Sequence, residues 1–224
     1  MEMLDRRTHY PVAVDCVIFG YDGIELKVAL IERKKLPFLG YWGLPGGFLI
    51  GIETVEQAAY RKLQEETGIH DIYLEQFHVF SNPDRDPRGH VITVAFFALI
   101  ASDKIELEPT TNVVRAQWFS AYQIPQLAFD HNEIYTKALE ALRIAIIIKP
   151  LVFKLLPKQF TLTMLQNLYE QIVGYSIDKR NFRKKILKDG YVQQTTKTTN
   201  GGQHRPAKLY KFNKSRYTYY PTMF

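Results

Sequence analysis

A glycine, a glutamate and a charged run follow one another at fixed distances between residues 47 and 69. Five residues separate the glycine from the glutamate, and seven more precede the charged run. The members of this pattern are Gly47, Glu53, Arg61, Lys62, Glu65, Glu66 and Gly68. Thr54 and Gln57 have the spacing of a capping box, and the glycine at position 68 is typical of the left-handed residue that ends a helix. The pattern therefore predicts a helix over residues 54–67.

The lysine at position 62 changes what this helix can bind. The spacing resembles the Nudix signature, which has glutamates at positions 62, 65 and 66, on one helix face. Such a face binds a divalent cation such as magnesium, which also holds substrate phosphates. With an ammonium group beside Glu65 or Glu66 we expect no metal, no other cofactor and no catalytic residue. The alternative is an ordinary amphipathic helix with a surface Lys–Glu pair.

Length and composition bound the domain number and the compartment. A chain of 224 residues with 46% apolar residues suits two globular domains. Cys16 is the only cysteine, which excludes a disulfide within the chain and favours a reducing compartment. The N-terminus does not resemble a signal peptide, and the most apolar stretch, residues 144–153, is too short to span a bilayer. We expect a cytoplasmic protein without a membrane partner.

Charge is distributed unevenly along the chain. Residues 151–224 hold 14 Lys and Arg against 3 Asp and Glu, a net charge of +11, whereas residues 1–150 have a net charge of −5. A strongly basic segment joined to an acidic one indicates that the basic segment binds a polyanion. The alternative is a solvated basic face that has no partner.

Residue patterning divides the chain near Pro150. Alternating residues predict strands at 11–19, 25–33, 73–80, 91–101 and 113–119, with loops at 36–47 and 81–88. Asp130 is a suitable N-cap for a helix to about residue 148. Residues 1–149 are therefore expected to form an α+β domain, an α/β/α sandwich around a mixed sheet.

Residues 150–224 have the pattern of a winged helix-turn-helix domain. Helices are predicted from Thr161 to about residue 173 and from Asp178 to about residue 188. Strands at 191–196 and 207–212 follow, joined by a turn at Asn200-Gly201-Gly202. Two helices followed by a β-hairpin give this DNA-binding architecture.

The second of these helices is almost entirely cationic on its polar face. Arginine suits guanine and asparagine suits adenine in the major groove, whereas lysines hold phosphates. Arg205, near the hairpin tip, could enter a minor groove. The candidate DNA contacts are Lys179, Arg180, Asn181, Arg183, Lys184, Lys188, Arg205 and Lys208. The alternative, a winged helix that binds protein, has no need of so much positive charge.

Nearly the whole chain resembles the Nudix-related transcriptional regulators of bacteria. The stretches that carry the resemblance include residues 37–40, 42–48, 61–63, 85–89, 127–131, 160–162, 181–184 and 205–210. The resemblance implies a homodimeric repressor on a double-stranded DNA operator, with a degenerate Nudix domain that senses a small-molecule effector. Branches of that family respond to ADP-ribose or to a pentose such as L-arabinose. The overall likeness favours L-arabinose.

The effector pocket is harder to locate from the sequence. The candidates are Asp15, Arg33, Phe48, Arg88 and His131. A carboxylate among apolar strand residues needs partners, which ligand hydroxyls or a nearby loop could supply. Arg88 could bind a phosphate or lie at the rim, Phe48 could stack on a ligand or fill the core, and His131 could simply follow a helix cap.

Two other functions compete with repression. The first is an active Nudix pyrophosphohydrolase that acts on ADP-ribose and has an accessory DNA-binding domain, because Glu53, Glu65 and Glu66 remain. The second is a single-stranded nucleic-acid binder, because C-terminal aromatic residues could stack on bases. These residues are Tyr210, Phe212, Tyr217, Tyr219 and Tyr220.

Overall fold

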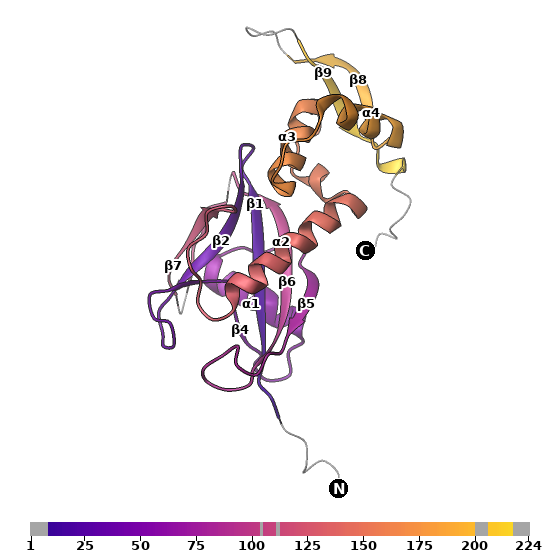
Figure 1. Ribbon diagram of the computed structural model, residues 1–224. Helices are drawn as coiled ribbons and strands as arrows, with labels where there is room; N and C mark the ends of the chain where they lie inside the picture. The colour runs from indigo at the N-terminus through magenta and orange to yellow at the C-terminus, as the bar shows by residue number, and fades with distance from the viewer. Residues whose placement is uncertain (1–8, 104, 111–112, 200–205, 217–224) are drawn as a thin grey trace, which may run out of the picture. The chain divides into compact units, whose positions relative to one another are not determined.

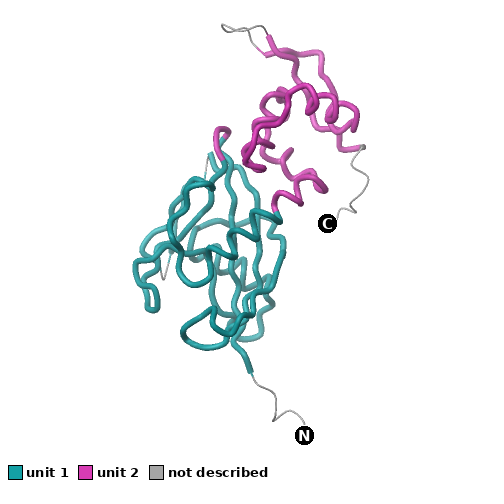
Figure 2. Tube along the Cα trace, viewed as in Figure 1, with its two compact units in different colours: residues 1–22, 26–141 teal, residues 23–25, 142–224 magenta. Residues whose placement is uncertain are grey.

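The computed structural model describes the chain except for residues 1–8, 104, 111–112, 200–205 and 217–224. It forms two compact units (Figures 1 and 2). The first comprises residues 1–22 and 26–141, and the second comprises residues 23–25 and 142–224. The boundary expected after residue 149 lies eight residues beyond this division, just past the end of helix α2 (His131–Ile148).

A mixed sheet forms the centre of the first unit (Figure 1). Strand β1 (Val12–Tyr21) runs parallel to β6 (Ile92–Ala101) and antiparallel to β2 (Leu26–Arg33). The outer strands β5 (Glu75–Phe80) and β7 (Val113–Ser120) pair antiparallel with β6 and β2. All five strands agree with the predicted ones to within two residues.

Helices cover both faces of this sheet. Alternate residues of β1 point to opposite faces, and Val14, Cys16 and Ile18 pack with α1 (Val55–Thr67) in one apolar cluster. On the other face the ring of Phe19 lies 5.9 Å from that of Tyr135 in α2. Figure 1 shows α1 and α2 on opposite sides of the sheet, which confirms the expected α/β/α sandwich.

Local signals set the ends of α1. Thr54 accepts a hydrogen bond from the backbone N–H of Gln57, whose side chain bonds back to Thr54, so the predicted capping box is formed. Gly68 ends the helix with φ of 76°, a left-handed conformation that glycine adopts without steric cost.

The segment predicted as a loop at residues 36–47 contains two short strands. Strand β3 (Trp42–Gly43) pairs with β2, and β4 (Gly46–Phe48) pairs with β1, which brings Gly46 opposite Asp15. Strands of two and three residues show no alternation, so the sequence pattern could not indicate them.

The second unit contains the predicted winged helix-turn-helix. After a 3₁₀ turn at Leu151–Lys154 come α3 (Leu162–Val173) and α4 (Lys179–Asp189), capped by Thr161 and Asp178 as predicted. Strands β8 (Val192–Thr198) and β9 (Lys208–Phe212) form the wing. A second 3₁₀ turn follows at Lys214–Arg216. The predicted turn at Asn200-Gly201-Gly202 lies outside the described residues.

The wing packs on the helices through aromatic side chains. Phe212 stacks on Phe153 at 4.3 Å between ring centroids, and Phe182 of α4 meets Tyr169 of α3 edge to face. Phe160 exchanges two backbone hydrogen bonds with Tyr210, which ties the start of α3 to β9.

Among the described residues, no helix combines the length and the apolar character needed to cross a bilayer.

Candidate functional site

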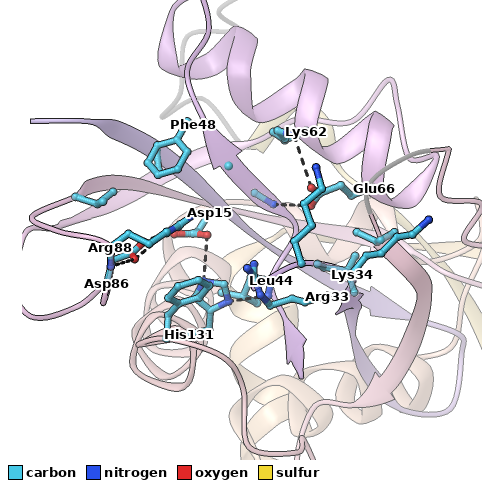
Figure 3. A pocket seen from close by; sticks show the side chains of 18 of the residues that line it. Asp15, Arg33, Lys34, Leu44, Phe48, Lys62, Glu66, Asp86, Arg88 and His131 are labelled. Carbon is cyan, nitrogen blue, oxygen red and sulfur yellow. Dashed lines mark hydrogen bonds and ion pairs between the residues drawn. The ribbon is translucent and has the colours of Figure 1, made fainter. Parts of the chain in front are cut away.

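A cavity of about 350 Å³ opens beside the carboxyl ends of β2 and α1 in the first unit. This volume lies within the range of small-molecule sites. All five effector candidates predicted from the sequence line it, together with four members of the spaced pattern (Figure 3). They are Asp15, Arg33, Phe48, Arg88 and His131, with Gly47, Arg61, Lys62 and Glu66.

Asp15 lines this cavity and has partners within the protein. Its Oδ2 accepts a hydrogen bond from Thr93 Oγ1 at 2.8 Å and lies 3.4 Å from Arg85 Nη2. The side chain is only 8% exposed. The structural alternative raised for Asp15, a hydrogen bond to a nearby loop, is therefore observed with Arg85, and the residue also contributes to the cavity wall.

His131, the first residue of α2, is a buried cavity residue. Its Nδ1 accepts a hydrogen bond from the backbone N–H of Leu44 at 2.9 Å, so the proton of the neutral ring is assigned to Nε2. Nε2 lies 3.4 Å from Asp15 Oδ1. Burial lowers the pKa of His131 and so favours the neutral ring. The charge of Asp15 acts in the opposite direction, but its effect is smaller.

Arg85 lines the cavity and is held in place by Asp130, which is not one of the lining residues. Arg85 Nε and Nη2 each donate to a different carboxylate oxygen of Asp130 at 2.8 Å. Asp130 directly precedes α2, and its carbonyl accepts a hydrogen bond from Ile134, but its carboxylate binds Arg85. Asp130 therefore has the expected position at the start of the helix, but its carboxylate pairs with Arg85 instead of capping the helix. Arg85 was missed as a site residue because its partner is 45 positions away.

Aromatic rings alternate with guanidinium groups along one wall. The Arg88 guanidinium carbon lies 4.9 Å from the ring centroid of Phe48 and 5.4 Å from that of Phe129. Arg33 lies 4.6 Å from the same Phe129 ring and also donates two hydrogen bonds to the carbonyl of Pro37. Burial, followed by the charge of Arg88, lowers the pKa of Arg33. The stack combines positive charge with flat apolar surfaces, which suits an anionic ligand with a ring.

Phe129 is held in an uncommon backbone conformation. Its φ is 54°, in the left-handed region that non-glycine residues rarely adopt. The edge of its ring meets Phe38, which has φ of 63°. Strain of this kind gathers at binding sites, and the sequence offered no signal for it.

The charged pattern forms a closed set of ion pairs. Arg61 binds Glu53 through Nε at 2.9 Å and Nη2 at 2.5 Å, and its Nη1 lies 3.3 Å from Glu65. Lys62 Nζ donates to Glu65 at 2.9 Å and lies 3.7 Å from Glu66 Oε1. The hydrogen bond from Arg61 lowers the pKa of Glu53. At Glu65 burial acts upward, but Lys62 and Arg61 hold its pKa below the usual value.

Glu66 is the most buried of these carboxylates. Burial raises its pKa to about 7, even though the backbone N–H of Gly46 donates to its Oε2 at 3.0 Å. Gly46 is required at this point, because a Cβ there would lie 2.3 Å from the carbonyl oxygen of Val14.

These residues do not fit a magnesium ion. Octahedral magnesium requires several free oxygen ligands, whereas every carboxylate of the pattern already binds a cationic side chain or a backbone N–H. Within the described part of the chain, no three His, Cys, Asp or Glu side chains are grouped to hold a metal ion.

The second candidate site is the outer face of α4. Asp178 accepts a hydrogen bond from the backbone N–H of Asn181, so Asn181 lies in the first turn of the helix. Arg183 is half-buried, and its Nη2 donates to Thr163 Oγ1 at 3.4 Å, which ties α4 to α3. The predicted contacts with exposed side chains are Lys179, Arg180, Asn181, Lys184, Lys188 and Lys208. Arg205 lies outside the described residues.

Comparison with known proteins agrees with both halves of the structure. The NUDIX domain model matches residues 9–142, and the model of the NrtR DNA-binding winged helix domain matches residues 152–212. The chain is 37% identical to the "ADPR responsive transcriptional repressor NtrR" of Acinetobacter baylyi, over 97% of this chain and 90% of that protein.

Two solved structures are similar as well. Shewanella oneidensis NrtR complexed with a 27mer DNA is 32% identical, with a TM-score of 0.72, over 93% of this chain and 96% of that one. The NUDIX domain of the same protein complexed with ADP ribose is 37% identical, with a TM-score of 0.56, over 62% of this chain and 92% of that one. The chain therefore belongs to the Nudix family, in the group that joins a Nudix domain to an NrtR DNA-binding winged helix domain.

Proposed function

We propose that the chain is a cytoplasmic, DNA-binding transcriptional repressor whose Nudix domain, residues 1–149, senses ADP-ribose without hydrolysing it. Residues 150–224 bind the operator. The observation that carries the proposal is the cavity wall, in which Phe48 and Phe129 alternate with Arg88 and Arg33. ADP-ribose contains a diphosphate with two negative charges, an adenine and two riboses, and such a wall complements it.

The relatives favour the same effector. The Acinetobacter repressor is named as ADPR responsive, and the NUDIX domain of Shewanella NrtR was crystallised with ADP ribose. The preference for L-arabinose suggested by the overall sequence likeness finds no support in these relatives. A neutral pentose would also bring no negative charge to a cavity that Arg33, Lys34, Lys35 and Arg88 line.

DNA binding by α4 follows from its exposed cationic face and from the match to a DNA-binding winged helix. We propose that two copies of the chain bind one operator, because helix-turn-helix repressors read two half-sites about one helical turn apart. Effector binding would then change how well both half-sites are met at once.

The test begins with the operator. A duplex bound by the full chain is selected from a random library, and its dissociation constant is measured by fluorescence anisotropy while ADP-ribose, AMP, ribose 5-phosphate or L-arabinose is added. ADP-ribose alone is expected to change the affinity for the duplex. An effect of L-arabinose alone would replace the proposed effector, and no effect of any of the four would remove the sensing role.

Hydrolysis of ADP-ribose is the second candidate, because Glu66 lines the cavity and Glu53 and Glu65 pair with lining residues. The ion pairs of Arg61 and Lys62 with these glutamates oppose it, since they occupy the oxygens that a metal would need. The unmodified protein is incubated with ADP-ribose and magnesium, and the products are separated by chromatography. Release of AMP and ribose 5-phosphate would show that the protein is a hydrolase.

The single-stranded nucleic-acid alternative is weaker. Tyr210 is buried and Phe212 is stacked on Phe153, so neither ring is free to stack on a base. Tyr217, Tyr219 and Tyr220 lie outside the described residues. Competition between duplex and single-stranded DNA of the same sequence tests this point, with a preference for the duplex expected.

A further inference from the structure

Lys62 occupies a position in the cavity that bears on how a diphosphate is held there. We infer that the Lys62 ammonium binds the diphosphate of the effector directly, so that effector binding requires no divalent cation. This inference rests on the proposed function, because it takes ADP-ribose as the ligand.

The Lys62 ammonium group has N–H donors beyond the one that Glu65 accepts. It carries three N–H groups, of which one donates to Glu65 Oε2 at 2.9 Å. Glu66 Oε1, at 3.7 Å, is close enough for an ion pair but too far for a hydrogen bond. Lys62 lines the cavity (Figure 3), and its side chain is 15% exposed, so a phosphate oxygen can reach it.

Gly47 provides the space in which the lysine lies. A Cβ at Gly47 would come within 2.7 Å of Lys62 Cε and 3.2 Å of its Cδ. The aliphatic part of Lys62 therefore runs directly along the backbone of β4, which forms the cavity wall. Glu65 and the β4 backbone together fix the side chain, so little conformational entropy remains to be lost when a ligand binds.

Arg61, the other cation of the pattern, uses its N–H donors in bonds within the protein. Its Nε and Nη2 bind Glu53, its Nη1 contacts Glu65, and its Nη2 also donates to the carbonyl of Phe48. Lys62 is therefore the cation of α1 that can turn a donor to a ligand. This explains how a cavity that does not fit magnesium can still attract a diphosphate.

The charge at position 62 either strengthens or opposes the attraction of a phosphate by the other cations that line the cavity. A glutamate there would place three carboxylates on one face of α1, and a phosphate would be repelled unless a metal ion bridged them. The lysine changes the local charge by two units and supplies a charge-assisted donor. A purely structural lysine would pair with Glu65 and Glu66 without contacting the ligand.

The experiment is isothermal titration of ADP-ribose into the full chain, once with EDTA and once with magnesium. The variants are Lys62→Gln, which removes the charge, and Lys62→Glu, which restores the signature. Lys137→Gln is the matched control, because Lys137 pairs with Glu140 at 3.1 Å with the same three-residue spacing but outside the cavity. Thermal unfolding of each variant checks that it folds.

We expect the unmodified chain and Lys137→Gln to bind equally well in both buffers. Lys62→Gln should bind at least about tenfold more weakly in both, because a hydrogen bond to a charged group is lost. Lys62→Glu should lose binding in EDTA. Adenosine, which lacks the diphosphate, serves as a competitor whose affinity Lys62→Gln should leave unchanged.

The inference alone is overturned if the unmodified chain binds only with magnesium, or if the ADP-ribose affinity of Lys62→Gln is unchanged. A loss of adenosine affinity equal to the loss for ADP-ribose would also overturn it, since it would reveal a structural role. If the unmodified chain binds ADP-ribose in neither buffer, the proposed function fails, and the inference fails with it.

Discussion

Arg85 and Asp130 form a bidentate ion pair at 2.8 Å, which joins the loop after β5 to the residue that precedes α2. Their side chains are 5% and 15% exposed. Asp15, at 3.4 Å, is the third member of this group and lines the cavity. The pair thus connects a residue that lines the cavity to the start of α2. Because both side chains are buried, we expect the loss of this contact to lower the stability of the fold.

We expect Asp130→Asn to lower the free energy of unfolding by about 3 kcal/mol, because it leaves the buried Arg85 charge with Asp15 as its remaining partner. The control is Glu32→Gln, which removes the partner of Arg115, a side chain that is 61% exposed. A surface pair of this kind contributes about 1 kcal/mol or less. Equal losses in the two variants, measured by chemical denaturation, would show that burial does not strengthen the contact.

His131 should make stability depend on pH. Its pKa is lowered from 6.5 by burial, in surroundings that also hold Asp15, Asp130, Arg85 and Arg33. The unfolded chain therefore binds a proton more readily than the folded one. The stability that the neutral ring contributes is present above pH 6.5 and is lost as the pH falls below that value toward the folded pKa.

His131→Asn should reduce this pH dependence, since asparagine can still accept the hydrogen bond from Leu44 without titrating. Thermal unfolding is compared at pH 7.5, 6.5 and 5.5, which lie above, at and below the ordinary histidine pKa of 6.5. His70→Asn is the control, because His70 is 66% exposed. If His131→Asn and the unmodified chain lose stability in parallel as the pH falls, His131 is not the group responsible.

Rules that act over a few residues predicted much of the fold. The capping box of Thr54 and the left-handed Gly68 set the ends of α1, and Thr161 and Asp178 set the starts of α3 and α4. Each depends on neighbouring backbone groups, so the sequence contains the whole cause. Strands β3 and β4 are different, because pairing with β2 and β1 alone holds their two or three residues extended.

The five residues proposed from the sequence as effector contacts line one cavity, but the connections among its residues were not predicted. Asp15 was proposed because a carboxylate interrupts an apolar strand face. Phe48 was proposed as a ring beside Gly47 that could stack on a ligand, and Arg88 as a loop cation that could reach a phosphate. Arg85 and Phe129 were missed. The role of Arg85 depends on a partner 45 positions away, and the role of Phe129 depends on a left-handed backbone that no residue type announces.

The Phe48 ring should contribute to effector affinity. It lines the cavity with the Arg88 guanidinium 4.9 Å from its centroid. Because a base or sugar that stacks on an aromatic ring gains roughly 1–3 kcal/mol, we expect Phe48→Leu to weaken ADP-ribose binding about tenfold in isothermal titration. Phe77→Leu, a half-buried phenylalanine of β5 outside the cavity, is the control. An unchanged affinity in Phe48→Leu would assign the ring to packing alone.

Arg180 and Lys184 of α4 should differ in what they contribute to DNA binding. Both side chains are exposed, but Arg180 lies in the first turn, where helix-turn-helix proteins contact base edges, and Lys184 lies one turn later. Arg180→Ala is expected to cost about 1–3 kcal/mol on the selected operator and to relax the preference for one base pair.

Lys184→Ala should instead weaken binding to every duplex alike and reduce the slope of log affinity against log salt by about one. Anisotropy titrations over a range of salt concentrations, on the operator and on a scrambled duplex, separate the two effects. Lys137→Ala, an exposed lysine of α2, controls for the loss of one positive charge from the chain. A salt slope that Lys184→Ala leaves unchanged would place this lysine away from the phosphates, and the face of α4 that meets DNA would have to be redrawn around Arg180 and Asn181.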